Sequence, residues 1–325
     1  MTVQSYLAPG ALAEALRRDA RAGLTASPKQ LPPKWFYDAL GSELFMQITR
    51  LPEYYPTRAE RAALDRYAGR IAEITGAKTL IELGSGSSEK TRLLLDALSR
   101  NGTLGKFVPL DVSESALAEA VSTLSADYPG IEVQGVVGDF TEHLSHLPNG
   151  SSRLVAFLGG TIGNLLPAQR AAFYSQLRDA LEPGEWFLLG ADLVKDPAVL
   201  VPAYDDAAGV TAEFNRNVLH VLNRELGADF EPEAFEHVAL WDPENEWIEM
   251  RLRASKPMRV AVPALGLTVE FAAREEMLTE VSAKFHREGI DAELTAAGLA
   301  VRRWWTDPDG RFSLTLAEAT RRPGD

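Results

Sequence analysis

Cysteine is absent from this 325-residue sequence, which excludes disulfides, thiolate catalysis and cysteine-based metal sites. Basic residues are outnumbered, 33 against 46 acidic ones, and the net charge of -13 disfavours nucleic acid and anionic membrane surfaces as partners. No apolar run approaches the ~20 residues that cross a membrane, and residues 1–24 lack the apolar core of a secretion signal. The sequence therefore predicts a soluble cytoplasmic protein, which we expect to be a monomer.

The usual metal and nucleophile motifs are also lacking. The five histidines form neither an H-E-x-x-H pattern nor a facial triad, and there is no G-x-S-x-G nucleophile elbow or Walker loop. His143 and His146 could share a helix face, but the polar residues around them favour a solvated position. We therefore predict that the protein has no metal site.

The most informative segment that is present covers residues 79–91, TLIELGSGSSEKT. An apolar run ends in Glu82, and Gly84-Ser85-Gly86 with the pair Ser87-Ser88 predicts a tight turn into a helix. Such a turn offers bare backbone amides and a helix N-terminus to an anionic ligand group. Position 89 is Glu, so the dinucleotide fingerprint is not met. The form E-x-G-x-G is instead typical of S-adenosylmethionine (SAM) methyltransferases, with a plain strand-turn-helix corner as the alternative.

Two more predicted strands end in acids. Residues 107–111 end in Asp111, where a carboxylate can accept both ribose hydroxyls of a nucleotide. Residues 131–140 end in Gly-Asp-Phe, so that Asp139 could accept the adenine amino hydrogens and Phe140 could offer its backbone N–H. Each acid alone is more often a loop or capping residue, but three such strand ends together favour an adenosyl site.

Strands and helices alternate through the middle of the chain, which predicts βαβ units and a parallel sheet. The predicted strands are 79–83, 106–110, 132–137, 153–159 and 186–192. The helices between them include 89–99, 113–125 and 167–181. A helix over 292–298 and two strands over 300–305 and 312–318 close the sheet as is usual in methyltransferases.

Residues 1–60 and 196–283 lie outside this alternation. The latter segment begins with a predicted helix over 199–225 and continues as strands over 234–241, 246–254, 258–262 and 267–271. We therefore predict an α/β protein with a Rossmann-like class I SAM methyltransferase sheet, formed by residues 61–195 plus 284–325. Residues 1–60 plus 196–283 would form a second, smaller α+β substrate-binding domain over the carboxyl ends of the strands, where open α/β sheets bind ligands.

Several segments together resemble one family. They are LPPKWFYD at 31–38, LPEYYPTR at 51–58, GGTIGN at 159–164, Tyr204-Asp205-Asp206 with FNRN at 214–217, and EVSAKF at 280–285. Over essentially its whole length the chain resembles the L-histidine Nα-methyltransferases of ergothioneine biosynthesis. The second and third of these segments are much more specific to that family than the E-x-G-x-G turn.

The resemblance implies a reaction and a set of site residues. The family uses SAM to trimethylate the α-amino group of free L-histidine, through its mono- and dimethyl forms, to hercynine, and releases S-adenosylhomocysteine. The implied SAM contacts are Gly84, Ser85, Lys90, Asp111, Asp139 and Phe140. The implied substrate contacts are Tyr54, Gly159, Asn164, Tyr204, Met250, Glu280 and Ser282, with Tyr37 and Phe45 near the pocket. Gly160 and Ala283 depart from the family pattern, and we expect neither to touch the chemistry.

The reaction itself needs a neutral amine held in line with the methyl group. Such positioning can contribute about 7–11 kcal/mol, and the neighbouring sulfonium lowers the pKa of the amine. A strong base is therefore optional. We expect Tyr37, Asn164 and Tyr204 to be the catalytic residues, with the Tyr37 hydroxyl and a water carrying the proton away.

Recognition of the substrate divides into two parts. Asn164 and Tyr204 can donate to the α-carboxylate without the desolvation cost of a buried arginine. Glu280 and Ser282 stand two residues apart in an extended segment and can face the same side. There the carboxylate would accept the imidazole N–H, and a ligand without that group would leave it unpaired.

Alternatives remain open for the residues and for the function. Asn164 could be a turn residue, Tyr204 a helix-face aromatic, and Glu280 and Ser282 a strand edge; the family match alone selects Tyr54 over its neighbour. The chain could also methylate another amino acid or amine, or bind SAM as a regulatory protein without turnover.

Overall fold

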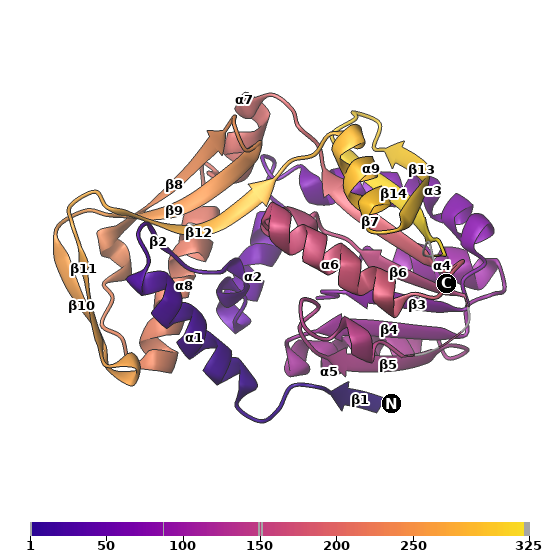
Figure 1. The fold of residues 1–325 in the computed structure, drawn as a ribbon, viewed down its shortest axis with the longest axis horizontal. Helices are drawn as coiled ribbons and strands as arrows, with labels where there is room; N and C mark the ends of the chain where they lie inside the picture. Colours follow the sequence, from indigo (N-terminus) through magenta and orange to yellow (C-terminus); the bar gives the residue numbers. More distant parts are fainter. Residues whose placement is uncertain (1, 87, 149, 151, 322–325) are drawn as a thin grey trace. The chain divides into compact units, whose positions relative to one another are not determined.

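The computed structural model describes residues 2–86, 88–148, 150 and 152–321 (Figure 1). The chain divides into two compact units. The first unit comprises Met1–Ala8, Pro56–Val194 and Phe285–Asp325, and the second comprises Pro9–Tyr55 and Lys195–Lys284. Ser87, one of the predicted helix-starting serines, lies outside the described residues. Within the described ranges, no helix is both long and apolar enough to cross a membrane.

An eight-stranded sheet forms the centre of the first unit, in the order β1-β5-β4-β3-β6-β7-β14-β13. Its strands are β1 Thr2–Ser5, β3 Thr79–Leu83, β4 Lys106–Asp111, β5 Glu132–Val137, β6 Arg153–Phe157, β7 Trp186–Asp192, β13 Leu299–Thr306 and β14 Phe312–Ala319. The first six strands in this order, β1-β5-β4-β3-β6-β7, are parallel, while β14 and β13 are antiparallel to their neighbours. The five predicted parallel strands and the closing pair are confirmed, and near-continuous apolar runs such as β3 suit a sheet that is covered on both faces.

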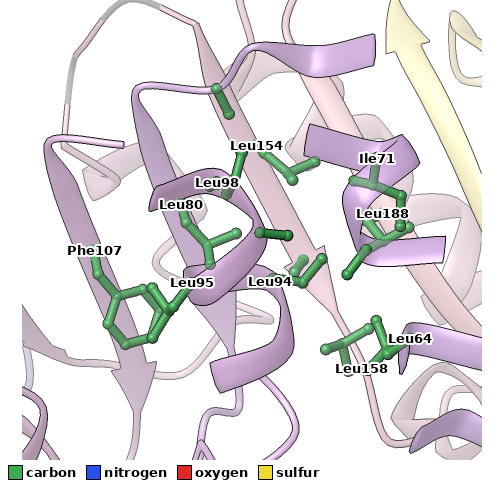
Figure 2. Close-up of a cluster of buried hydrophobic side chains, with 14 of the residues drawn as sticks. Leu64, Ile71, Leu80, Leu94, Leu95, Leu98, Phe107, Leu154, Leu158 and Leu188 are labelled. Atoms are coloured by element: carbon green, nitrogen blue, oxygen red, sulfur yellow. The ribbon is translucent and has the colours of Figure 1, made fainter. Parts of the chain in front are cut away.

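Helices cover both faces of this sheet. They are α3 Pro56–Thr75, α4 Arg92–Arg100, α5 Glu114–Asp127, α6 Pro167–Ala180 and α9 Arg287–Ala296. Figure 2 shows the buried core that α3 and α4 form with one face of the sheet, where their leucines meet Leu80, Leu154 and Leu188. On the opposite face, the Phe173 ring of α6 packs against Phe157 at a centroid distance of 4.9 Å. This packing holds the carboxyl ends of the central strands in place.

The second unit contains a four-stranded sheet in the order β2-β12-β9-β8 and a separate β10-β11 hairpin. Its strands are β2 Lys29–Gln30, β8 Phe235–Asp242, β9 Trp247–Ala254, β10 Met258–Val262, β11 Leu267–Phe271 and β12 Glu276–Ala283. Its helices are α1 Ala11–Thr25, α2 Ala39–Ile48, α7 Pro197–Leu200 and α8 Val210–Leu226. The strands that alternation predicted after residue 233 are confirmed.

Several predictions about element and domain boundaries are wrong. The helix predicted over 292–298 is α9, which begins five residues earlier and ends at Ala296. The helix predicted over 199–225 is interrupted, because the Asp206 carboxylate accepts from the backbone N–H groups of Val210 and Thr211 and starts α8 there. The helix predicted over 89–99 begins only at Arg92, after a turn. Residues 1–60 do not stay together either, since β1 joins β5 and α3 starts at Pro56; Lys195 and Lys284 fall in the second unit.

Candidate active site

The acid of the E-x-G-x-G motif anchors the glycine-rich turn of the first unit. The Glu82 carboxylate is buried at the end of β3, where it accepts hydrogen bonds from the hydroxyls of Ser88 (2.9 Å) and Thr91. Burial raises the pKa of Glu82 to about 7, although the two hydroxyls and Lys90 oppose the rise. Gly84 has a φ of 66°, which glycine adopts without strain. The Glu82 side chain therefore shapes the turn.

The neighbouring strand β4 fixes the same turn. The backbone N–H groups of Gly84 and Ser85 donate to the Leu110 carbonyl, at 2.9 and 3.1 Å. The N–H of Gly86 donates to the Asp111 carboxylate at 3.0 Å. The prediction that this turn offers bare backbone amides is thus wrong for these three residues, because the adjacent strand end uses them. Asp111 does lie against the glycine-rich turn, and its contact with the ribose stays a prediction.

Three other predicted SAM contacts belong to this turn or follow β5. The Ser85 hydroxyl oxygen is buried and has no hydrogen-bond partner among the described residues, so a bound ligand can supply one. A Cβ at Gly84 would lie 3.9 Å from the Phe140 ring, which brings the ends of β3 and β5 together. Asp139 accepts from the backbone and hydroxyl of Thr141, at 2.8 and 2.6 Å. These features fit an adenosyl ligand.

Lys90 is held by a residue that sequence reasoning missed. The Glu60 carboxylate in α3 forms an ion pair with Lys90, and its Oε1 accepts from the backbone N–H of Gly159 at 2.7 Å. Glu60 is fully buried, and a Cβ on Gly190 would lie 2.3 Å from its Oε1. A predicted SAM contact and a predicted substrate contact therefore share one carboxylate. Glu60 stands in a helix rich in charged residues, and no local signal marked it.

Asn164 also belongs to the first unit. It is the last residue of a 3-10 helix, Thr161–Asn164, that follows β6, and it is half-buried. Gly159 and Gly160 before it have φ values of 81° and 69°, so this backbone path favours glycine at both positions. Gly160, which departs from the family pattern, is therefore suited to the backbone conformation at its position.

In the second unit, a β-bulge decides which way Glu280 and Ser282 point. Between Leu278 and Glu280 the pairing of β12 with β9 shifts, so that Glu280 lies opposite Met250 and Ser282 opposite Ile248. Without the shift, strict alternation from Met277, which lies opposite Leu252, would instead place Thr279 and Val281 on this face. Because of the bulge, both predicted imidazole contacts share a face with Met250.

Tyr204 meets this face from a distant part of the chain. Its hydroxyl lies 2.8 Å from the Ser282 hydroxyl, and Lys284 Nζ donates to both oxygens, at 2.7 and 2.9 Å. Tyr204, Ser282, Glu280 and Lys284 are all buried. Sequence reasoning missed Lys284, although its place two residues after Ser282 continues the same alternation.

A buried chain of hydrogen bonds supports Tyr204 from behind. His237 Nε2 lies 2.8 Å from the Tyr204 carbonyl oxygen, and Asn215 Nδ2 lies 2.8 Å from His237 Nδ1. Burial lowers the pKa of His237, so the ring is neutral, donates through Nε2 and accepts at Nδ1. The Thr279 hydroxyl of the bulge lies 2.7 Å from Asn215 Oδ1. The bulge and the backbone of Tyr204 therefore belong to one network.

The predicted aromatic residues form a row within the second unit. Tyr37 packs edge-on against Phe45 at 5.5 Å between ring centroids, Phe45 against Tyr54 at 6.0 Å, and Tyr54 against Tyr204 at 6.3 Å. Tyr37 is 43% exposed, whereas Tyr54 is buried. The row connects the tyrosine predicted to move a proton with the one predicted to bind the carboxylate.

Comparisons with known proteins identify the family of the chain. Residues 16–319 match the model of a family described as histidine-specific, SAM-dependent methyltransferase. The chain is 60% identical over 317 residues to the histidine N-alpha-methyltransferase of Mycolicibacterium smegmatis and 57% identical to that of Mycobacterium tuberculosis, covering 98% of this chain and 99% of each relative. A shorter match, 33% identical, pairs 62% of the chain with 23% of ergothioneine biosynthesis protein 1 of Neurospora crassa.

Proposed function

This chain belongs to the family of histidine-specific, SAM-dependent methyltransferases, and from that premise we propose that it trimethylates the α-amino group of free L-histidine to hercynine, the first step of ergothioneine biosynthesis. The observation that carries the proposal is the 60% identity, over 98% of the chain, to a histidine N-alpha-methyltransferase. The buried face with Glu280, Ser282 and Tyr204 supports it, because these groups complement an imidazole and a carboxylate.

The first unit would hold SAM, which supplies an electrophilic methyl group when bound. Asp111 would accept the ribose hydroxyls, and Asp139 and Phe140 would bind the adenine. The buried Ser85 hydroxyl, which lacks a partner among the described residues, supports a ligand at the glycine-rich turn. Gly84 and Lys90 complete the proposed set, and the buried Glu60 would keep the Lys90 ammonium in position.

Substrate recognition would use a hydrogen-bond acceptor for the imidazole and hydrogen-bond donors for the α-carboxylate. Glu280 would accept the imidazole N–H and Ser282 would lie beside it, with Met250 packed opposite Glu280. The Tyr204 hydroxyl and the Asn164 amide would donate to the α-carboxylate. Tyr54 and Gly159 remain proposed substrate contacts, and the Tyr37 hydroxyl, with a water, would take the proton that the amine loses.

The test is to incubate the purified protein with SAM and L-histidine and to follow the mass of histidine. Gains of one, two and three methyl groups are expected, with none on tryptophan or histamine. If SAM binds but histidine is unchanged while another amine is methylated, the substrate assignment is wrong. If SAM binds and no amine is methylated, the protein is a non-catalytic SAM binder.

Two finer points belong to the same proposal. We expect the protein to be cytoplasmic, which fractionation of cells that express it would test. We also expect a monomer, which light scattering of the purified protein would test.

A further inference from the structure

Lys284 belongs to the cluster around Tyr204 but not to the predicted site. Its Nζ lies 2.7 Å from the Tyr204 hydroxyl, 2.9 Å from the Ser282 hydroxyl and 4.7 Å from the centre of the Tyr204 ring. Only 4% of the residue is exposed. Moving a lysine ammonium from water into the interior is costly. Such a position therefore calls for a functional or structural reason.

The chemistry of the donors sets the direction of the hydrogen bonds. An ammonium has three hydrogens to donate and accepts none, so both hydroxyl oxygens accept from Lys284. The hydroxyl hydrogens of Tyr204 and Ser282 must then point away from Lys284, and one of them lies in the 2.8 Å bond between the two oxygens. The cluster is thereby arranged as a hydroxyl donor backed by a cation, which complements an anionic acceptor.

We propose that Lys284 is a positioning residue through which the enzyme selects substrates that carry an α-carboxylate. It would act through Tyr204, whose hydroxyl it orients and polarises, and it would favour a charged carboxylate over a neutral carboxamide. This inference rests on the proposed function, in which Tyr204 donates to the carboxylate of histidine. It assigns the selection for charge to a residue that does not itself touch the substrate.

The size of the effect follows from the distances. A carboxylate oxygen that accepts from the Tyr204 hydroxyl at about 2.7 Å would lie about 5 Å from the Lys284 nitrogen. Opposite charges at that separation attract appreciably even in an effective dielectric of about 20. Part of this attraction offsets the desolvation of the carboxylate. We expect the charge of Lys284 to be worth about 10- to 100-fold in affinity for histidine.

The experiment compares full-length wild type, Lys284→Met and Lys284→Arg on L-histidine and on L-histidinamide, which has a carboxamide in place of the carboxylate. Methylation would be followed by mass spectrometry and SAM binding by calorimetry. Lys284→Met is expected to raise KM for L-histidine by about 10- to 100-fold and to leave kcat, the Kd for SAM and KM for L-histidinamide nearly unchanged. Lys284→Arg keeps the charge and should restore most of the loss.

A matched control removes a lysine from the sheet whose strand β12 ends just before Lys284. Lys29 in β2 pairs with Glu275 and takes no part in the Tyr204 cluster, so Lys29→Met should leave both KM values unchanged. An equal rise in KM for both substrates in Lys284→Met would overturn the inference, and so would an unchanged KM for L-histidine. If Lys284→Met fails to bind SAM because it misfolds, KM for L-histidine and for L-histidinamide is compared between Lys284→Gln and Lys284→Arg instead, and the same outcomes support or overturn the inference. Failure of the proposed function would already appear in the wild type, as unmethylated histidine.

Discussion

Glu82 makes the stability of the first unit depend on pH in a direction opposite to that of most carboxylates. Burial raises its pKa from an ordinary 4.5 to about 7, so the folded protein binds this proton more tightly than the unfolded chain does. The stabilisation is fully present below pH 4.5 and is lost as the pH rises through about 7. The difference between the two pKa values corresponds to about 3 kcal/mol in the free energy of unfolding.

Glu82→Gln tests this value directly, because glutamine stays neutral and can still bond the Ser88 and Thr91 hydroxyls. We expect the variant to gain stability relative to wild type by about 3 kcal/mol between pH 4.5 and pH 8. The assay is urea unfolding of both proteins, followed by circular dichroism at several pH values, with the exposed Glu142→Gln as control. The other titratable groups are the same in both proteins, so their contributions cancel when the stability of wild type is subtracted from that of Glu82→Gln. If that difference stays flat across this range, the reasoning about Glu82 is refuted.

Three further substitutions test the two sites. Glu280→Ala should raise KM for histidine at least 100-fold, an effect of about 3 kcal/mol, while calorimetry finds SAM binding intact; equal loss of both would contradict the assigned role. Gly190→Ala should lower the free energy of unfolding by about 1–3 kcal/mol, since its Cβ would lie 2.3 Å from Glu60 Oε1, whereas Gly289→Ala, with open space around it, should not. Thr279→Val removes the hydroxyl that contacts Asn215 and Met250 and should cost about 1–2 kcal/mol in thermal unfolding; it should also raise KM for histidine, and an unchanged KM would separate the bulge from the substrate site.

Local patterns were sufficient for much of the fold. Apolar runs of five to seven residues between turn residues located the parallel strands, because strands buried on both faces need such runs. The ends of these strands also pointed to an adenosyl ligand, since parallel strands bring their carboxyl ends to one edge. The break in the chain before α8 was missed because the Asp206 carboxylate accepts from the backbone N–H groups of Val210 and Thr211, and such local bonds compete with helical continuation.

The identity of the reaction came from family-specific segments, and the arrangement of the site came from the fold. Glu60 meets Lys90 and Gly159 across 30 and 99 residues of sequence, and Lys284 meets Tyr204 across 80. Periodicity along a helix or strand describes only near neighbours, so it cannot predict such meetings.

The sequence by itself determined the alternation of strands and helices from residue 79 to residue 192, the acids at the strand ends and the family. Only the tertiary structure decided that the Glu82 carboxylate shapes the turn, that Glu60 holds Lys90, and that one bulge turns Glu280 and Ser282 toward Met250. The physical reason is that the side-chain period of a strand is two, so one extra residue reverses every side chain after it. Whether that residue is accommodated depends on the partner strand and on the Asn215 contact, which lie far away along the chain.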